Sequence, residues 1–354
     1  MTTWEPAAFR DQVQQVLDAF LDEREAELAP LGPDATRLIA EARTAVRGGK
    51  RFRAAFCHWG YRAIRPDVAD ATVLARACAS LEMLHASALV HDDYMDASDT
   101  RRGRPATHRA FEAEHRAAGW RGDPEQYGAA AAILLGDLLL GWAEDMLRRS
   151  GFGVEEVTSG LALFEQCRNE VIAGQFLDVS VQARGSADVD TAMTVLRYKS
   201  AKYSIERPLH IGAGLAGADP ARIAELSRFG LPLGEAFQLR DDLLGVFGDP
   251  DVTGKPAGDD LVEGKRTVLV ALALDAAPQA AAQRLDSALG TPLSGADVDE
   301  LRAIIEASGA RAQVEAVIGE LADHAVEALR AADVDERARV VLTELAAAAT
   351  QRTV

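Results

Sequence analysis

The sequence predicts an almost entirely helical protein, and three features indicate this fold class. Of its 354 residues, 48% are hydrophobic and 26% are charged, an ordinary composition for a globular chain. Alanine and leucine dominate, and runs of β-branched residues are short. Apolar residues recur mostly at intervals of three and four, which is the period of a helix with one buried face. The length suffices for one large domain or two small ones.

Helical periodicity predicts the elements in order along the chain. An apolar stripe from Phe9 to Leu21 predicts a helix over 6–28, which Pro30 and Gly32-Pro33 end. Further helices are expected at 34–46, 128–148, 154–181, 226–247 and 267–274, with an apolar helix leading to Asp92 and polar-faced helices after Gly290.

Two segments between these helices carry specific expectations. Residues 104–127 are rich in charge, glycine and proline, so we expect a loop there. Pro208 lies within a helical pattern that opens at Leu196, and it predicts a kink near Arg207.

Net charge and cysteine usage narrow the function classes. The formal net charge is −17, so nucleic-acid binding is not expected, because it needs a basic surface. Cys57, Cys78 and Cys167 lie in helical, partly apolar stretches without a CxxC pair, which predicts buried free thiols. No signal peptide is seen, and no apolar run reaches the ~18 residues that cross a bilayer. We therefore expect a cytoplasmic location and no transmembrane segment.

The most informative stretch is 81–103, where an apolar helical run enters an acidic sequence. Asp92 and Asp96 are four residues apart, so they project from one face of a helix. Two like charges there are costly unless a cation lies between them, and Mg²⁺ typically combines one or two carboxylates with phosphate oxygens. Arg101 and Arg102 follow, and guanidinium groups match phosphate. The alternative is a solvated acidic helix end with a basic loop behind it.

A second acidic pair, Asp241 and Asp242, lies inside an apolar helix, where acids are seldom placed for packing. The glycine- and proline-rich segment after it is typical of a lid and carries Lys255 and Lys265. Face to face, the two acidic pairs would hold several Mg²⁺ ions over a polyanion. Metal and cation stabilisation of a leaving diphosphate is electrostatic catalysis.

Basic residues outside the acidic stretches admit two interpretations. Gly48 and Gly49 followed by Lys50 and Arg53 form either a glycine helix cap with a solvated basic turn or a diphosphate clamp. A lone helical histidine is more often a satisfied core or surface residue than a ligand. His85 matters because it lies about two turns before the carboxylates.

Polar residues on two later helices are equally ambiguous. Gln175 and Asp178 are three residues apart beside a glycine, an odd choice for plain packing, and they could line a polar cavity. Lys199 and Ser200 open the next helix, where they either cap it or reach a phosphate.

On these motifs the chain closely resembles the trans-type isoprenyl diphosphate synthases, or polyprenyl synthetases. The resemblance runs from about Arg37 to the last helices and rests on motifs in the family order: GGKRFR, LEMLHASALVHDDYMDASDTRRGRPATH, GQFLD, YKSAKYS and GEAFQLRDDLLGVFGDPDVTGKPAGDDLVEGKRT. It implies an all-α bundle of the isoprenoid synthase type around a central cavity, commonly a homodimer. We expect a single domain over 1–354, with a catalytic core at about 37–290 and C-terminal helices at 291–354.

The resemblance also implies roles for individual residues. Mg²⁺, about three ions per site with Mn²⁺ as a substitute, would be bound by Asp92, Asp93, Asp96, Asp241 and Asp242. The allylic diphosphate would be bound through the metal and by Arg101, Lys199 and Lys255, with the Ser200 hydroxyl beside Lys199. Isopentenyl diphosphate would be bound by Lys50, Arg53, His85 and Arg102. Gln175 and Asp178 would support the metals and the developing cation, and Lys265 would close the lid.

The implied reaction joins these groups in one mechanism. Metal and basic residues pull diphosphate from the allylic substrate, and the isopentenyl double bond attacks the resulting carbocation. A proton then leaves, and the apolar cavity excludes water that would quench the cation. The catalytic set is Asp92, Asp96, Gln175, Lys199, Ser200 and Asp241.

Product length depends in this family on side-chain bulk just before the first aspartate motif. Ser87 and Ala88 are small here, and the aromatic residue that limits products to farnesyl length is missing. Leu84 and Leu81, one and two turns further back, would form the floor. We expect geranylgeranyl diphosphate (C20), with a longer polyprenyl product or farnesyl diphosphate (C15) as alternatives.

Three departures from the family pattern bear on activity. Ala54 stands where proline is usual, and Ser200 replaces threonine but keeps the hydroxyl. Gly245 replaces the third aspartate of the second motif, although Asp249 lies one turn on. We expect activity to survive.

Two other classes of protein share part of the pattern. A class I terpene cyclase has no isopentenyl site, so Lys50, Arg53 and His85 argue against it. A non-catalytic regulatory subunit of a heteromeric prenyltransferase tends to lose an aspartate motif, whereas both remain here apart from Gly245.

Overall fold

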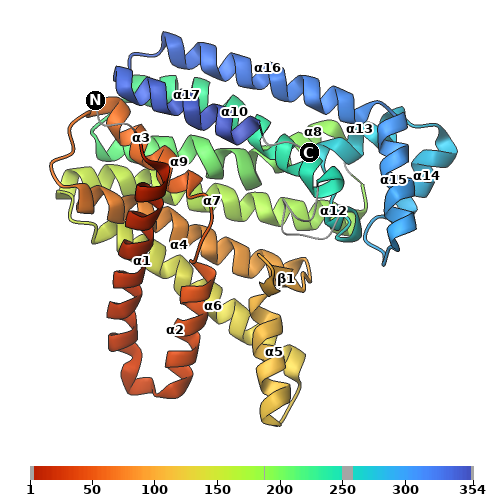
Figure 1. Cartoon of the computed structure of the whole chain (residues 1–354), viewed down its shortest axis with the longest axis horizontal. Helices are drawn as coiled ribbons and strands as arrows, with labels where there is room; N and C mark the ends of the chain where they lie inside the picture. Colours follow the sequence, from red (N-terminus) through yellow and green to blue (C-terminus); the bar gives the residue numbers. More distant parts are fainter. Residues whose placement is uncertain (1–3, 187, 249–257, 352–354) are drawn as a thin grey trace. The chain divides into compact units, whose positions relative to one another are not determined.

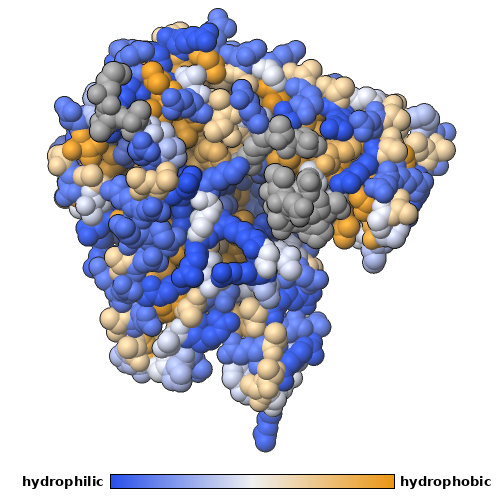
Figure 2. Space-filling view, in the orientation of Figure 1, coloured by the Kyte–Doolittle hydropathy of each residue, from blue (hydrophilic) through white to orange (hydrophobic). Residues whose placement is uncertain are grey.

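The structure is a computed structural model that describes residues 4–186, 188–248 and 258–351. Most of these residues lie in helices (Figure 1). The only strands among them are Thr100–Arg101 (β1) and Arg104–Pro105 (β2), an antiparallel pair with Arg101 opposite Arg104. The predicted all-α fold class is confirmed. Hydrophilic side chains cover much of the face seen in Figure 2, as the charged composition leads one to expect.

Two compact units make up the chain, and each combines segments that are far apart in sequence. The first contains 1–165, 208–223 and 334–341, and the second contains 166–207, 224–333 and 342–354. The expected single domain with C-terminal helices after 290 stays a prediction, because this division does not test it.

The first unit is built around helix α4 (Ala71–Met95), which packs against α1, α3 and α6. The Asp70 side chain caps α4 by accepting a hydrogen bond from the Thr72 amide at 2.8 Å. The other helices of this unit are α1 (Pro6–Leu28), η1 (Ala29–Leu31), α2 (Pro33–Ala45), α3 (Phe52–Ile64), α5 (Thr107–Ala118) and α6 (Pro124–Arg148), with the start of α7 (Val154–Arg184), most of α9 (Arg207–Leu215) and the start of α17 (Glu336–Thr350).

Helix α4 is long and apolar enough to cross a membrane by length and composition alone. Its most apolar stretch is, however, 72% buried inside the protein, so it fits a core helix. No other helix among the described residues meets that criterion. The cysteines are buried free thiols, as predicted.

The second unit surrounds a core formed mainly by α10 (Pro220–Phe247) and α13 (Val268–Ala276), with Leu243 and Leu269 fully buried. Around them lie the remainder of α7, α8 (Val189–Val195), the π-helix η2 (Leu196–Glu206), α12 (Asp259–Val262), α14 (Gln279–Ala288), α15 (Gly295–Ala307), α16 (Ala310–Ala331) and the rest of α17. Helix α16 buries one apolar stripe in this unit, since Val314, Ile318 and Leu329 are buried.

One prediction for an individual segment is wrong, and the kink expected near Arg207 stays a prediction. The loop expected at 104–127 is wrong over α5, where Phe111 and His115 are four residues apart and buried, and α5 packs on α6. Charged residues between the buried positions obscure the helical period of α5 in the sequence. Gly119 ends the helix with a left-handed φ of 64°. At Arg207 the helix changes type, since the π-helical segment ends at Glu206 and α9 begins.

Candidate active site

The first acidic motif lies at the end of α4. Asp92 and Asp93 occupy its last turn, and Asp96 is its C-cap residue, whose amide donates to the Asp92 carbonyl at 2.8 Å. Asp93 is only 3% exposed, whereas Asp92 and Asp96 remain partly accessible. The helix therefore buries one acid of the motif and leaves the other two partly accessible.

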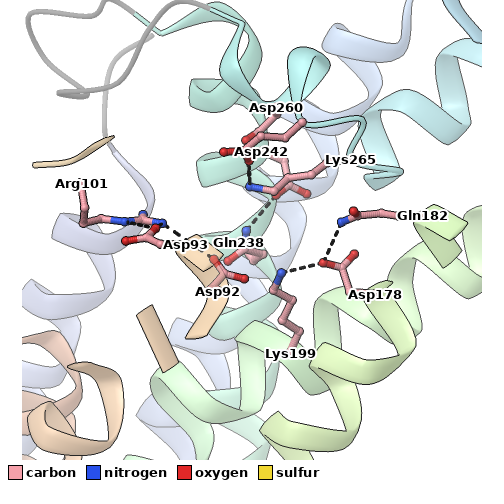
Figure 3. A network of polar contacts seen from close by, with 11 residues as sticks. Asp92, Asp93, Arg101, Asp178, Gln182, Lys199, Gln238, Asp242, Asp260 and Lys265 are labelled. Atoms are coloured by element: carbon pink, nitrogen blue, oxygen red, sulfur yellow. Dashed lines mark hydrogen bonds and ion pairs between the residues drawn. The ribbon is translucent and has the colours of Figure 1, made fainter. Parts of the chain in front are cut away.

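Arg101 on β1 pairs with the buried acid of this motif. Its Nε donates to Asp93 Oδ1 at 2.7 Å, and its Nη2 contacts the same oxygen. Asp92 Oδ2 lies 3.8 Å from that Nη2 (Figure 3). Arg101 thus holds the β1–β2 hairpin against α4, close to where the resemblance expects a diphosphate.

Arg102 joins the hairpin to the glycine-rich loop before α3. Arg102 and Gly103 both have positive φ, 52° and 72°, as a two-residue type I′ hairpin turn requires. The Arg102 Nη1 donates to the Arg47 carbonyl at 2.6 Å. A Cβ on Gly49 would lie 3.1 Å from Arg102 Nη2, so the glycine keeps room for this guanidinium.

The structure reveals a structural role for Arg51 that the sequence reasoning missed. Arg51 is 5% exposed and donates to Gln14, to the Val46 carbonyl and, at 3.1 Å, to Glu82 on α4. The Ala54 amide also donates to Glu82. Arg51 thus holds the loop in place from a buried position. The sequence feature that indicates this role is Glu82, a lone acid in an apolar helix that needs a buried basic partner.

His85 lies within a cluster of arginines, which we call the basic cluster: Arg53, His85 and Arg102. Burial lowers the pKa of His85 well below its usual range, and the positive charges of Arg53, Arg102, Arg101 and Arg51 lower it further. Burial and these arginines likewise lower the pKa of Arg102. Such a concentration of positive charge is what an anion would relieve. The structure therefore brings three of the four predicted isopentenyl-site residues together, and Lys50 is exposed on the adjoining loop.

In the second unit, Lys199 on η2 forms an ion pair with Asp178 on α7. The distance from its Nζ to Asp178 Oδ2 is 2.6 Å, and Gln182 donates to the same oxygen at 3.3 Å (Figure 3). Gln175, one turn before Asp178, is partly buried. Asp178 therefore fixes the ammonium group that is expected to bind a diphosphate.

One face of α7 holds η2 in place. Glu170, Gly174 and Asp178 are spaced four apart, so they share that face. Glu170 accepts from Lys202 at 3.1 Å and from Arg207 at 2.7 and 2.8 Å. Burial opposes ionisation of Glu170, but these hydrogen bonds and charges keep its pKa below the ordinary value.

The same face of α7 makes backbone contact with η2 at its middle position. A Cβ on Gly174 would lie 2.4 Å from the Lys199 amide nitrogen, which requires glycine there. π-Helical turns are rare and occur frequently at functional sites, and this one carries both Lys199 and Ser200.

The second acidic motif lies on α10. Asp242 is 7% exposed and accepts a hydrogen bond from Gln238 at 2.8 Å, while Asp241 stays partly accessible. Burial raises the pKa of Asp242 to about 8, and the charges of Asp260 and Asp241 add to the shift, although Gln238 and Lys265 oppose it. A buried carboxyl among other acids is the donor set that a divalent cation would stabilise.

Lys265 is the basic residue that the structure places near this motif. Its Nζ lies 2.5 Å from Glu263 Oε2 and 3.4 Å from Asp260 Oδ1. Lys255 and Asp249 lie outside the described residues. Within the described part of the chain, no group of three or more His, Cys, Asp and Glu side chains forms a ready-made metal site. Mg²⁺ fits such incomplete sets, because it fills its coordination with water and substrate phosphates.

The four predicted chain-length residues differ in their surroundings. Leu81 and Leu84 are buried, and Leu84 and Ala88 lie eight and four residues before Asp92, so they share its face of α4. Ser87 instead faces α6, where its hydroxyl donates to the Gly136 carbonyl at 2.8 Å.

Comparisons with known proteins agree with these features. The family model described as polyprenyl synthetase matches residues 36–307. The geranylgeranyl diphosphate synthase of Mycobacterium tuberculosis is 36% identical over 74% of this chain and 69% of its own. A short chain isoprenyl diphosphate synthase of Methanothermobacter thermautotrophicus is 33% identical over 76% of this chain and 77% of its own.

A solved structure extends the likeness to nearly the whole chain. The geranylgeranyl pyrophosphate synthase of Corynebacterium glutamicum, complexed with isoprenyl diphosphate and magnesium, superposes with a TM-score of 0.96. It is 42% identical and covers 99% of this chain and 100% of its own.

Replacing Gly174 tests whether α7 positions Lys199. In Gly174→Ala the new Cβ meets backbone that cannot rotate away, so η2 must shift, and affinity for inorganic pyrophosphate with Mg²⁺ should fall about tenfold. Titration calorimetry measures the affinity, and thermal melting reports stability. Gly319→Ala is the control, because nothing lies within 4 Å of a Cβ there. Unchanged affinity in Gly174→Ala would contradict the positioning role.

Proposed function

We propose that this chain condenses isopentenyl diphosphate with allylic diphosphates to make geranylgeranyl diphosphate (C20). The chain belongs to the polyprenyl synthetase family and is a trans-isoprenyl diphosphate synthase. The observation that carries the proposal is the coexistence of two kinds of anion site. Both aspartate motifs are present, and the basic cluster of Arg53, His85 and Arg102 is a separate group on the first unit. A two-substrate condensation of diphosphates needs both.

The basic cluster suits the isopentenyl diphosphate. Guanidinium groups bind phosphate in paired hydrogen bonds, and the depressed pKa of His85 keeps its imidazole neutral, so that it can donate without adding charge. Arg51 and Glu82 hold the loop that carries Arg53, which keeps the binding groups in place before substrate arrives.

The aspartate motifs suit the allylic diphosphate and its metal. Asp92, Asp96 and Asp241 would hold Mg²⁺, and the occupancy of about three ions and replacement by Mn²⁺ are part of the proposal. Bound Mg²⁺ supplies charge neutralisation for the departing diphosphate. Within the first unit Asp93 anchors Arg101, and within the second unit Asp178 anchors Lys199, so each cation is held in place to donate to a phosphate.

Product length follows from α4 in this proposal. From Asp92 toward the start of α4, the residues met in turn are Ala88, Leu84 and Leu81. A prenyl chain that grows from a diphosphate near Asp92 would therefore pass the small alanine first and reach the leucines later. The relatives named as geranylgeranyl diphosphate synthases support the C20 product.

We also propose that the protein is a homodimer in the cytoplasm. Ile133 and Leu134 on α6 are 45% and 60% exposed, and Phe176 on α7 is 73% exposed, which is unusual for large apolar residues on helices. Buried free thiols fit a reducing compartment.

Incubation of the purified protein with Mg²⁺, isopentenyl diphosphate and each of dimethylallyl, geranyl and farnesyl diphosphate tests the reaction. We expect all three starters to be elongated and the products to stop at C20 by mass spectrometry. Chelation of the metal should abolish elongation. No elongation from any starter would refute the proposed function, whereas products beyond C20 would refute only the leucine floor.

Substitutions on α4 test the length assignment. Leu84→Ala should give products longer than C20, because it deepens the space before the floor, and Ala88→Phe should shift the product toward C15. Ser87→Ala is the matched control, because the Ser87 hydroxyl donates a hydrogen bond to the Gly136 carbonyl on α6. The length of the product made by this variant should be unchanged. Leu84→Ala should also cost about 2–5 kcal/mol of stability, which melting will report. A longer product from Ser87→Ala alone would contradict the assignment.

Sedimentation analysis tests the dimer. Phe176→Asp should convert a dimer into a monomer, because it places a charge in a surface that would be buried by a second copy. Val154→Asp is the control, because Val154 is 85% exposed in the first turn of α7, where an acid is favourable. A monomeric unmodified protein, or a variant that stays dimeric, would count against this interface.

A further inference from the structure

Helix α1 sends one polar side chain to the loop that carries basic residues of the site. Gln14 is partly buried, and its Oε1 accepts a hydrogen bond from Nη2 of Arg51 at 2.6 Å. Its Nε2 donates to Asp18 Oδ1, one turn further along α1, at 3.0 Å. Because a carboxylate only accepts, Asp18 fixes the amide with its oxygen toward Arg51. All three residues belong to the first unit, and α1 precedes every motif of the site in sequence.

Arg51 depends on this acceptor because its guanidinium is buried. The residue is 5% exposed, and the same Nη2 also donates to the Val46 carbonyl at 2.6 Å. Its Nη1 donates to Glu82 Oε2 on α4 at 3.1 Å. Arginine stays charged in proteins, and a buried N–H group that loses its acceptor costs free energy. Gln14 therefore supplies one of the contacts that keep the Arg51 side chain in this position.

The backbone at Arg51 makes these side-chain contacts matter for its neighbours. Arg51 is the N-cap residue of α3 and has a φ of 57°, a left-handed conformation that is costly for a residue other than glycine. Such a conformation persists only where the surroundings fix it. A guanidinium released by Gln14 would let the Arg51 backbone relax. Lys50, directly before it, and Arg53, two residues after it, would then turn.

We propose that Gln14 is a positioning residue for isopentenyl diphosphate, acting through Arg51 on residues 48–53. The inference rests on the proposed function and adds helix α1 to the elements that set affinity for the substrate that is not activated. Gln14 itself touches no substrate in this proposal. The first aspartate motif is held separately by Arg101, so affinity for the allylic substrate should not depend on Gln14.

Gln14→Leu tests the role, because leucine is close to glutamine in size and has no acceptor. We expect affinity for isopentenyl diphosphate, measured by titration calorimetry without added metal, to fall about tenfold. In steady-state elongation the KM for isopentenyl diphosphate should rise by a similar factor. The KM for geranyl diphosphate should change by less than about twofold. Equal losses for the two substrates would contradict positioning of the isopentenyl site.

An exchange of amide and acid along α1 tests for rescue. In the double variant Gln14→Glu with Asp18→Asn, the new carboxylate accepts from Arg51, and the new amide at position 18 donates to that carboxylate. Affinity for isopentenyl diphosphate should return to within about threefold of the unmodified protein. A folded double variant that binds as weakly as Gln14→Leu would overturn the inference, because the acceptor is present again.

Two other variants of α1 separate positioning from a general loosening of the helix. Gln15→Leu makes the same replacement at an exposed neighbour, and its affinity for isopentenyl diphosphate should be unchanged. Val13→Ala leaves a cavity at a fully buried position, so it should lower the melting temperature and leave that affinity within about twofold. If Val13→Ala weakened binding as much as Gln14→Leu, the effect would be destabilisation of α1, and the inference would fail.

The outcomes distinguish this inference from the proposed function. An unmodified protein that elongates allylic substrates, combined with a Gln14→Leu variant that binds isopentenyl diphosphate equally tightly, would overturn the role of Gln14 alone. An unmodified protein that elongates no starter would overturn the proposed function.

Discussion

The rest of the structure depends on the free-energy cost of placing carboxylates in or beside apolar helices. Asp93 and Asp242 are 3% and 7% exposed, and neither can be charged there without a partner. Asp93 is matched by Arg101, and Asp178, also buried, is matched by Lys199. Asp242 accepts a hydrogen bond from the Gln238 amide, and burial raises its pKa to about 8 although the charge of Lys265 opposes the shift. An added cation near the second motif would therefore favour the charged form of this buried acid.

Backbone strain gathers around the basic cluster for a related reason. Gly48, Gly49, Arg51, Arg102 and Gly103 all have positive φ, and two of them are arginines, for which this conformation is costly. The surroundings hold both. Arg51 is tied by its buried contact with Glu82, and Arg102 by the Arg47 carbonyl. The strain places guanidinium groups near His85 that a relaxed loop would direct into water.

The candidate site residues can be picked out in the sequence, because acids in apolar helices and cations after glycine pairs are unusual in composition. Helix bounds can likewise be predicted from the sequence where one face is apolar. Helix α1, for example, spans Pro6–Leu28 as predicted. What sequence could not supply is pairing across the chain. In the sequence Arg51 resembles its neighbours Lys50 and Arg53, and its burial against Glu82 is what distinguishes it from these two candidate binding residues. The period of helix α5 is hard to see in the sequence, because charged residues stand between its buried positions Phe111 and His115. The contacts of η2 with Gly174 and Glu170 of α7 join segments that no local pattern connects.

The difference between the two kinds of anion site has a chemical reason. One diphosphate must leave and the other must stay, so a site that favours departure should strengthen its interactions as negative charge grows on the leaving group. Carboxylates that recruit divalent cations do this, because the cation's interaction with the oxygens increases as the carbon–oxygen bond breaks. In the proposed reaction the basic cluster would bind the second diphosphate with hydrogen bonds that change little, and the neutral His85 would add a donor without adding charge. Metal-recruiting acids and guanidinium groups would then let one protein activate one diphosphate while it only binds the other.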